Sequence, residues 1–95
     1  MLPIIELEVF KEDKVIETIK LEGKTQFILG SNREKSNVVL MHASISRCHA
    51  ALIVDQVKGV MIVDLLSKAG TWVNSVKQQS LVAEPIRIKD TIKFG

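Results

Sequence analysis

The chain has 95 residues, 46% of them hydrophobic and 25% charged. Independent cores usually need on the order of 100 residues each, so this length predicts a single domain over residues 1–95. No apolar run approaches the ~18 residues of a membrane span, and residues 1–6 lack the basic start of a secretory signal. Cys48 is the only cysteine, so it has no partner for an internal disulfide. A soluble intracellular protein is therefore expected.

The charge balance argues against nucleic acid as a direct partner. The chain carries 13 basic and 11 acidic residues, a net charge of +2. This excess is too small to predict nucleic-acid binding, and aromatic side chains, at 4%, are too few to stack exposed bases. We expect no nucleic acid, no membrane and no cofactor among the direct partners.

Short stretches of alternating or continuous apolar residues predict an all-β fold. The expected strands cover, in chain order, residues 5–9, 15–21, 26–29, 38–40, 48–54, 60–65, 71–73, 86–88 and 91–94. The first two, joined by a polar turn at 12–14, predict an opening hairpin, and the last two predict another around 89–90. Residues 48–54 are apolar on both faces, as in a strand covered on both sides. Strands at intervals of roughly 8–12 residues are typical of a sandwich or barrel.

Four short motifs follow one another along the chain. Gly30 ends a strand, and residues 46–50 are Ser-Arg-Cys-His-Ala. Residues 70–74 are Gly-Thr-Trp-Val-Asn, and residues 90–95 are Asp-Thr-Ile-Lys-Phe-Gly. In this order they resemble a forkhead-associated (FHA) domain, from about residue 5 to residue 95. The resemblance is strongest to the nuclear group that includes the nuclear inhibitor of type 1 protein phosphatase, which has a similar Leu-x-Val-x-Lys opening strand and a Ser-Arg-x-His-Ala-Ala block.

The resemblance implies an antiparallel β-sandwich whose loops at one end bind phosphothreonine in a peptide. Ser46 matches the serine that contacts phosphate in the family, Arg47 a position that sometimes does so, and Lys68 a position beside the peptide. A phosphate with about −1.5 to −2 charges needs several donors, at least one of them cationic. Trp72, in a short strand, is expected to serve packing. Other matching positions support the loops: Gly30, His49, Gly70, Thr71 and Asn74.

Two positions depart from the family pattern. The family's Gly-Arg pair is here Gly30-Ser31, which removes the principal phosphate-binding arginine, and the asparagine that holds the peptide backbone is here Ala69. A hydrogen bond to a charged group contributes about 1.5–3 kcal/mol, which Arg33 or Arg47 would have to replace. The sequence therefore supports two functions. One is phosphothreonine recognition; the alternative is a degenerate FHA domain that binds partners without phosphate or dimerises.

The C-terminal residues add an expectation about the whole polypeptide. FHA domains usually continue past the Phe-Gly corner, here Phe94-Gly95, into a last strand that pairs with the first. We therefore expect a fragment of a longer protein, without its last strand. The first strand would then have an unpaired edge, which invites weak self-association. The resemblance also implies the nucleus rather than the cytoplasm.

The spacing of the polar residues argues against catalysis and metal binding. Ser46, His49 and Asp64 would be nucleophile, base and orienting acid, but residues three apart in a strand point to opposite faces. No Gly-x-Ser-x-Gly elbow accompanies them. A metal site formed by His42, Cys48 and His49 lacks a fourth ligand. Cys48, at the head of an apolar strand, is expected to be a small buried side chain. No enzymatic activity is expected.

Overall fold

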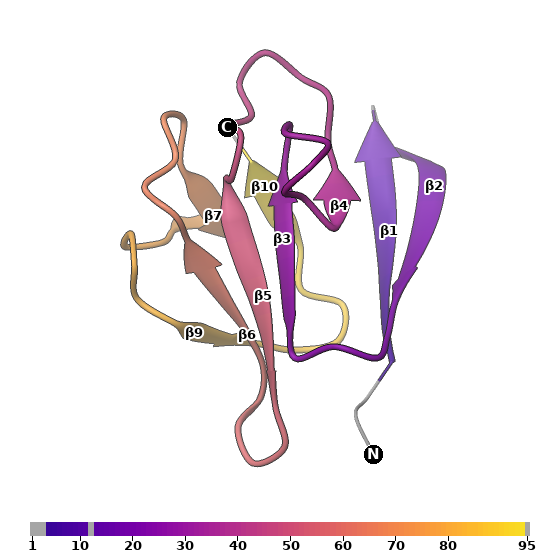
Figure 1. Cartoon of the computed structure of the whole chain (residues 1–95), viewed down its shortest axis with the longest axis vertical. Helices are drawn as coiled ribbons and strands as arrows, with labels where there is room; N and C mark the ends of the chain where they lie inside the picture. The colour runs from indigo at the N-terminus through magenta and orange to yellow at the C-terminus, as the bar shows by residue number, and fades with distance from the viewer. Residues whose placement is uncertain (1–3, 12, 95) are drawn as a thin grey trace.

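The computed structural model describes residues 4–11 and 13–94. Glu12 of the predicted first turn and Gly95 of the Phe-Gly corner lie outside the described residues, as do residues 1–3. The described residues form strands and no helix, so they contain no helix that could cross a membrane (Figure 1). In chain order the strands are β1 (Ile5–Lys11), β2 (Lys14–Leu21), β3 (Gln26–Gly30), β4 (Val38–Val39), β5 (Ala50–Asp55), β6 (Gly59–Asp64), β7 (Thr71–Val73), β8 (Val76–Lys77), β9 (Glu84–Ile86) and β10 (Ile92–Phe94).

The strands form two facing layers. One layer is a five-stranded sheet in the order β4-β3-β5-β6-β9. The other layer contains the three-stranded sheet β10-β7-β8 and the hairpin β1-β2 (Figure 1). Side chains from both layers pack into one core. The prediction of an all-β sandwich is therefore confirmed.

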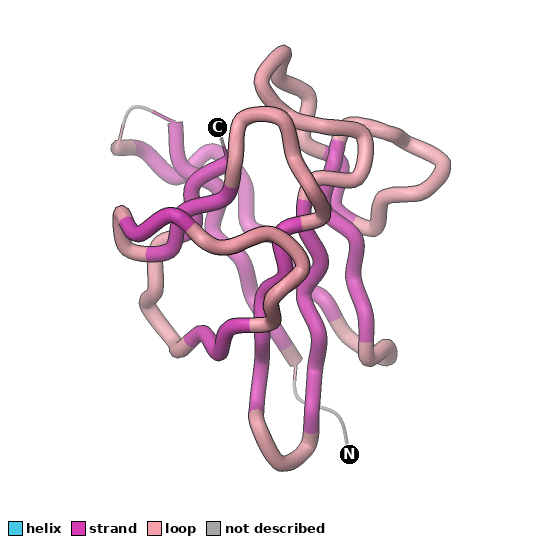
Figure 2. Tube along the Cα trace, turned by 90° about the vertical axis from the view of Figure 1, so that its left-hand side faces the viewer, coloured by secondary structure: helices cyan, strands magenta, loops and turns pink. Residues whose placement is uncertain are grey.

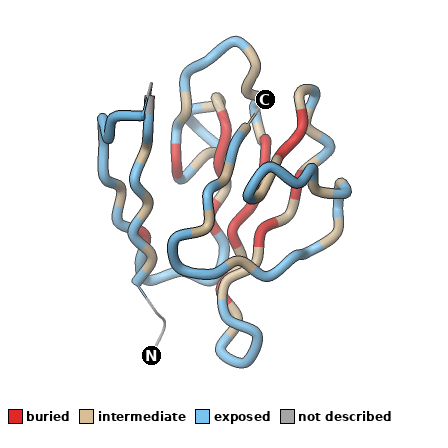
Figure 3. The backbone as a smooth tube through the Cα atoms, turned by 180° about the vertical axis from the view of Figure 1, so that it is seen from behind, coloured by how far each residue is buried: buried red, intermediate tan, exposed pale blue. Residues whose placement is uncertain are grey.

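The core is built from side chains at alternate strand positions that point between the layers. Its buried members are all apolar: Leu21, Phe27, Leu29, Val38, Ala50, Leu52, Val54 and Ile62. Among the described residues, the polar side chains of His49, Asp64 and Thr71 are buried as well. Buried residues concentrate in the five-stranded sheet, whereas the β1-β2 hairpin is mostly exposed (Figure 3). The polar groups inside the molecule must therefore be satisfied by neighbouring protein atoms.

The predicted opening hairpin is confirmed. β1 pairs with β2 in antiparallel register, with Leu7 opposite Ile19. A second hairpin joins β5 to β6, and at its turn the Asp55 carboxylate accepts hydrogen bonds from the backbone N–H groups of Val57 and Lys58. Among the described residues β1 pairs only with β2, so its other edge is open.

The predicted hairpin over residues 86–94 is wrong. Ile86 ends β9 and lies opposite Val60 of β6 in the five-stranded sheet. β10 instead pairs with β7 in the opposite layer. The connection through residues 87–91 therefore crosses from one layer to the other. Alternating residues on both sides of a polar pair identify two strands, but they do not identify the partner of each strand.

Three connections meet at one end of the sandwich. They are residues 31–37 after β3, residues 40–49 before β5 and residues 65–70 after β6 (Figures 1 and 2). The β5-β6 hairpin lies at the opposite end (Figure 1). β5 begins at Ala50, so residue 48, which we expected to start this strand, belongs to a loop. We call this end, with its three connections, the loop end.

Gly30 allows two of these connections to touch. A Cβ atom at this position would lie 1.9 Å from the Arg47 carbonyl oxygen. Without one, the Ser31 N–H donates to the Ser46 carbonyl oxygen at 3.1 Å, and the Asn32 N–H donates to the Arg47 carbonyl oxygen at 3.2 Å. Glycine is required here for space, since its φ is not among the positive values.

We expect Gly30→Ala to lower the free energy of unfolding by about 3 kcal/mol, the upper part of the range for overpacking, because the Arg47 backbone must move. Urea unfolding followed by circular dichroism measures the loss. Gly23→Ala is the matched control. Gly23 has φ +79°, and no atom lies within 4 Å of the added Cβ. The expected loss of stability is therefore only the cost of placing alanine in a left-handed backbone conformation, about 1 kcal/mol. Equal losses in the two variants would contradict the steric explanation.

Candidate functional site

The buried imidazole of His49 joins two of the loops. Its Nδ1 accepts a hydrogen bond from the Ser46 backbone N–H at 3.1 Å, and its Nε2 lies 2.7 Å from the Gly70 carbonyl oxygen. A backbone N–H only donates and a carbonyl oxygen only accepts, so the ring proton is on Nε2. The ring also packs edge-on against Phe94, with 5.1 Å between the ring centroids. His49 is therefore a fixed link between residues 46–49 and residue 70.

The Ser46 hydroxyl faces the loop after β6. Its Oγ accepts a hydrogen bond from the Lys68 backbone N–H at 3.0 Å. This bond uses a lone pair of the oxygen, so the hydroxyl hydrogen remains available to an acceptor outside the protein. Ser46 is half-buried and Lys68 is exposed. The structure thus brings these two predicted binding residues together.

The expectation that Ser46 and His49 point to opposite faces is wrong, because residues 46–49 form a loop rather than a strand. The two residues are in contact, but through the Ser46 backbone and not through its hydroxyl. Asp64 binds Ser67 and Thr71 instead of the His49 ring. The three residues therefore do not form the relay of a nucleophile, a base and an orienting acid.

Asp64 anchors the loop that follows β6. Its carboxylate, 2% exposed, accepts hydrogen bonds from Ser67 N (3.2 Å) and Oγ (2.5 Å), Thr71 Oγ1 (2.7 Å) and Ser80 Oγ (2.6 Å). Burial by itself would raise the pKa of Asp64. The hydrogen bonds from Ser67, Ser80 and Thr71 favour the charged form and lower its pKa from 3.8 to about 2. The sequence pattern indicated Asp64 as a candidate member of a catalytic triad, and it did not predict this role as a loop anchor.

The loop of residues 31–37 is attached to Arg47 through backbone groups. The Arg47 carbonyl oxygen accepts hydrogen bonds from Asn32 N (3.2 Å) and Ser36 Oγ (3.3 Å). Within the loop, the Asn32 side-chain oxygen accepts hydrogen bonds from the backbone N–H groups of Glu34 (2.9 Å) and Lys35 (3.2 Å). The side chains of this loop therefore project from a braced backbone.

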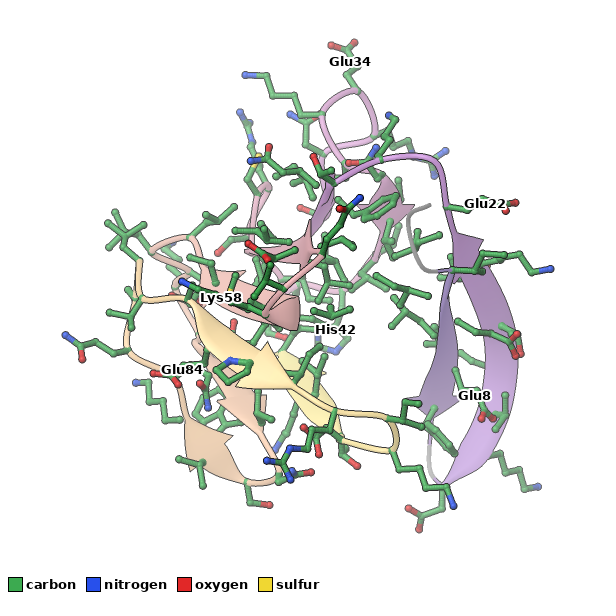
Figure 4. The ribbon with its side chains drawn as sticks, turned by 90° about the horizontal axis from the view of Figure 1, so that it is seen from below. Glu8, Glu22, Glu34, His42, Lys58 and Glu84 are labelled. Carbon is green, nitrogen blue, oxygen red and sulfur yellow. The ribbon has the colours of Figure 1, made fainter. Side chains whose placement is uncertain are left out.

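An open depression of about 440 Å³ lies where this loop meets Arg47. Its lining residues are Ser31, Asn32, Arg33, Glu34 and Arg47. Both arginines are exposed, and Ser31 is half-buried. Glu34 lies at the outer tip of the loop (Figure 4). Three of the predicted binding residues, Ser31, Arg33 and Arg47, thus surround one hollow, and Ser46 precedes Arg47 in the chain.

The loop after β6 provides the opposite side of the loop end. The Lys68 side chain is exposed, and Ala69 is half-buried. The methyl group of Ala69 offers no hydrogen bond to a peptide. Gly70, with φ +91°, holds the His49 ring through its carbonyl oxygen, and Thr71 is buried.

Asn74 lies away from these loops. It occupies the turn between β7 and β8, and its Nδ2 donates to the Asp90 carboxylate at 3.0 Å. Its side-chain oxygen accepts the Thr91 N–H at 2.9 Å, and its own N–H donates to the Thr91 carbonyl oxygen at 2.8 Å. Asn74 therefore braces the connection before β10.

Three other residues considered in the sequence lie outside the depression and the hydrogen bonds described above. Cys48 is half-buried in a loop, so the expectation of a buried strand residue is wrong. His42 is exposed, and its Nδ1 lies 2.8 Å from Ser44 Oγ. Trp72 is half-buried in β7 and does not belong to the hydrophobic core. Within residues 4–11 and 13–94, no three His, Cys, Asp or Glu side chains gather as possible metal ligands.

We expect protonation of Asp64 alone to lower the free energy of unfolding by about 2 kcal/mol as the pH falls from about 4 to about 2. Each unit by which the folded and unfolded pKa values differ corresponds to about 1.36 kcal/mol. Its folded pKa lies below the ordinary 3.8, so the unfolded chain binds the proton more readily in this window. The stabilisation is complete above the unfolded pKa and is lost as the pH falls through the folded pKa. Urea unfolding at a series of pH values measures it.

Asp64→Asn is the comparison, because asparagine does not titrate. The stability gap between the original chain and the variant should shrink by about 2 kcal/mol on acidification. The pKa values of Asp55 and Asp90 are also lowered, by hydrogen bonds, but both residues are present in both proteins and cancel. A gap that does not change with pH would rule out Asp64 as the source.

Comparisons with known proteins show which sequences and folds this chain resembles. In sequence, the chain is 33% identical over 94 residues to the human nuclear inhibitor of protein phosphatase 1, covering 98% of this chain and 27% of that protein. In structure, the FHA domain of CT664 from Chlamydia trachomatis has a TM-score of 0.81 and 27% identity, over 93% of this chain and 85% of that one. Mycobacterium tuberculosis EmbR, in complex with a low-affinity phosphopeptide, has a TM-score of 0.71 and 26% identity. The alignment covers 82% of this chain and 19% of that chain.

The family assignment rests on a match to a family model over most of the chain. The chain spans only 27% of the length of the phosphatase inhibitor that it matches. A family model described as the FHA domain matches residues 27–95. This range includes the loop end, with His49, Asp64 and both arginines of the depression. The chain belongs to the FHA domain family.

Proposed function

We propose that the chain is a protein-interaction module that binds phosphothreonine of a partner protein at its loop end. The observation that carries the proposal is the position of Arg33, Arg47 and Ser31 around one open depression. The Ser46 hydroxyl lies against the Lys68 backbone in the same set of loops. A phosphate needs several donors, at least one cationic, that are already held in place. The bracing of these loops by His49 and Asp64 supplies the second condition.

The proposed phosphate contacts are divided between the two sides of the loop end. On one side, the guanidinium groups of Arg33 and Arg47 offer forked donors. On the other side, the Ser46 hydroxyl donates its free hydrogen, and the Lys68 ammonium adds a point charge. In this proposal Arg33 replaces the arginine that the family carries at the position of Ser31. Its place in the same depression as Ser31 supports the exchange.

The charge of the loop end supports the proposal as well. Residues 31–47 and 66–70 contain four basic side chains, Arg33, Lys35, Arg47 and Lys68, and one acidic side chain, Glu34. The excess of three positive charges is larger than the net +2 of the whole chain. Positive potential concentrated at a set of loops attracts a dianionic group and speeds its association.

The similar proteins agree with this function and suggest where it operates. EmbR, 26% identical, is in complex with a phosphopeptide, and the part of it that aligns covers 82% of this chain. The 33% identical relative is named as a nuclear inhibitor of protein phosphatase 1. We therefore place the proposed module in the nucleus. Its partner is a phosphorylated protein, and the module itself carries out recognition rather than catalysis.

We expect the chain to bind a degenerate phosphothreonine peptide library and not its unphosphorylated copy. Arg47→Ala and Arg33→Ala should each weaken binding about 10-fold or more, because a hydrogen bond to a charged group contributes about 1.5–3 kcal/mol. Ser46→Ala should weaken it less, because a neutral donor contributes about 1 kcal/mol. Fluorescence anisotropy with labelled peptides measures the affinity, and added salt should reduce it.

Lys58→Ala is the matched control, since Lys58 lies in the β5-β6 hairpin at the opposite end of the molecule. It should leave the affinity unchanged. Equal binding of phosphorylated and unphosphorylated peptides would contradict the proposal. That result would instead support the alternative of a phosphate-independent FHA domain, which the residues Ser31 and Ala69 favour. A phosphoserine library tests the preference for threonine.

We expect Glu34→Gln to strengthen phosphopeptide binding about 2- to 5-fold. Glu34 lines the depression beside Arg33, and its carboxylate repels a dianion across a solvent-exposed surface, where such interactions amount to about 0.2–1 kcal/mol. The same anisotropy titration measures the gain, and it should disappear at high salt. Glu84→Gln, in β9 of the five-stranded sheet, is the control. A loss of affinity in the Glu34 variant would place the phosphate elsewhere.

A further inference from the structure

We propose that the outer face of the sheet β10-β7-β8 is a second docking surface, which binds an acidic protein segment that presents an apolar side chain. This surface is separate from the phosphate contacts proposed for the loop end. Its central residue is Trp72, the only tryptophan in the chain. A half-exposed tryptophan on the outside of a sandwich needs a reason that core packing does not provide.

The strand register places two lysines on either side of Trp72. In β10, Lys93 lies directly opposite Trp72, and in β8, Lys77 lies opposite it on the other side. Directly opposite residues of neighbouring strands point to the same face of a sheet. The neighbours of Trp72 in β7 point the other way: Thr71 is buried and Val73 packs against the core. The outer face therefore carries a row of lysine, tryptophan and lysine across three strands.

The tryptophan ring is held in place on this face. The Lys77 Nζ lies 5.6 Å from the centre of the ring, within the range of a cation–π interaction. A Cβ added to Gly70 would lie 3.0 Å from both the ring and the Lys77 side chain, so the ring lies close over Gly70. Fixed aromatic side chains lose little conformational entropy on binding, which makes them effective anchors at interfaces.

A depression of about 490 Å³ lies beside the ring. Its lining residues are Trp72, Asn74, Ser75, Thr91 and Lys93. The hydrogen bonds between Asn74 and Thr91 hold two of its sides together. The hollow therefore has one aromatic wall, one cationic wall and a braced polar rim. An apolar side chain against Trp72 and a carboxylate against Lys93 would fill it.

The charge of the surface specifies an acidic partner. The strand register places Lys77 and Lys93 on the outer face, and the connection that leads into β10 contains Arg87, Lys89 and one acidic residue, Asp90. The Asp90 carboxylate is already used, since it accepts hydrogen bonds from Asn74 Nδ2 at 3.0 Å and from the Arg87 N–H at 2.8 Å. Complementary charge across an interface steers association and selects partners. The occupant is therefore a segment with carboxylates on both sides of an apolar residue.

The test uses the intrinsic fluorescence of Trp72, which reports on this surface without a label. The probe is a short synthetic peptide of alternating Glu and Leu residues, and its reference is the same peptide with Gln in place of every Glu. The acidic peptide should shift the Trp72 emission, and the reference should bind at least about 3-fold more weakly. The double variant Lys77→Gln, Lys93→Gln should lower the affinity for the acidic peptide about 2- to 20-fold, measured by anisotropy of a labelled peptide.

Two single variants serve as controls. Lys58→Gln removes a lysine at the far end of the molecule and should leave the affinity for the acidic peptide unchanged. Arg47→Ala should also leave it unchanged, because Arg47 belongs to the depression at the loop end. With these controls, the proposal of a second surface and the proposal of phosphothreonine binding can be tested separately.

Four results would overturn the proposal. Equal affinity for the acidic and the neutral peptide would remove the role of charge. A loss as large in Lys58→Gln as in the double variant would reduce the effect to overall charge. A loss in Arg47→Ala would move the acidic peptide to the loop end. A Trp72 emission that depends on protein concentration without peptide, together with a dimer in sedimentation, would make a second copy of the chain the occupant.

Discussion

The loop end depends on one buried ring. His49 connects the Ser46 N–H on one loop to the Gly70 carbonyl oxygen on another. An imidazole is suited to this position because its two nitrogens lie on opposite sides of the ring, one as acceptor and one as donor. Inside a core an unpaired polar atom costs about 1–3 kcal/mol, so both bonds must be present together. The loops are therefore either joined or strongly destabilised.

Asp64 extends the same constraint along the chain. Its carboxylate accepts hydrogen bonds from the hydroxyl groups of Ser67, Thr71 and Ser80, which lie in the loop after β6, at the start of β7 and after β8. No buried side-chain oxygen or nitrogen among the described residues lacks a hydrogen-bond partner. Satisfied buried networks of this kind make a structure rigid. A ligand at the loop end then has less entropy to remove when it binds.

The hydrogen bonds that hold the three loops of the loop end together are called the frame here. The frame and the candidate binding groups use different atoms of the same residues. Ser31 and Lys68 enter the frame through their backbone N–H groups, and Arg47 enters it through its carbonyl oxygen. The exposed side chains of Lys68 and Arg47 are therefore free to change without loss of the frame. This separation explains how serine occupies position 31, where the family carries an arginine. In the proposed function, the exchange changes the groups that the loop end offers to a ligand and leaves the backbone hydrogen bond of residue 31 in place.

Much of the fold follows from local sequence patterns. Alternation over residues 5–9 and 15–21 predicted the opening hairpin, and the apolar stretch at 48–54 predicted the central strand β5. The prediction of a final hairpin was wrong because alternation carries no information about which strands pair. Ile86 lies opposite Val60, which is far away in the sequence. The start of β5 was also placed too early, since apolar Cys48 continued the strand pattern into a loop.

The site was predicted less completely, for a related reason. The motif residues Ser46, Arg47 and Lys68 are recognisable one by one, but their contacts run between distant loops. Asp64 had a local signal, an acid at the end of a buried strand followed by Ser67, since such acids often accept the backbone N–H groups of the next turn. The bond from Ser80 to Asp64 had no such signal, because sixteen residues separate the two.

Gly70 is the point at which the two proposed surfaces meet. Its carbonyl oxygen holds His49 beneath the loop end, and its missing side chain leaves room for the Trp72 ring on the outer face. A residue shared in this way would couple the surfaces only if it had two positions. His49 fixes one side of Gly70, and the ring of Trp72 closes the other. We therefore infer that the surfaces act independently, so that a partner with both a phosphothreonine and an acidic segment gains affinity through its linker rather than through a change in the domain.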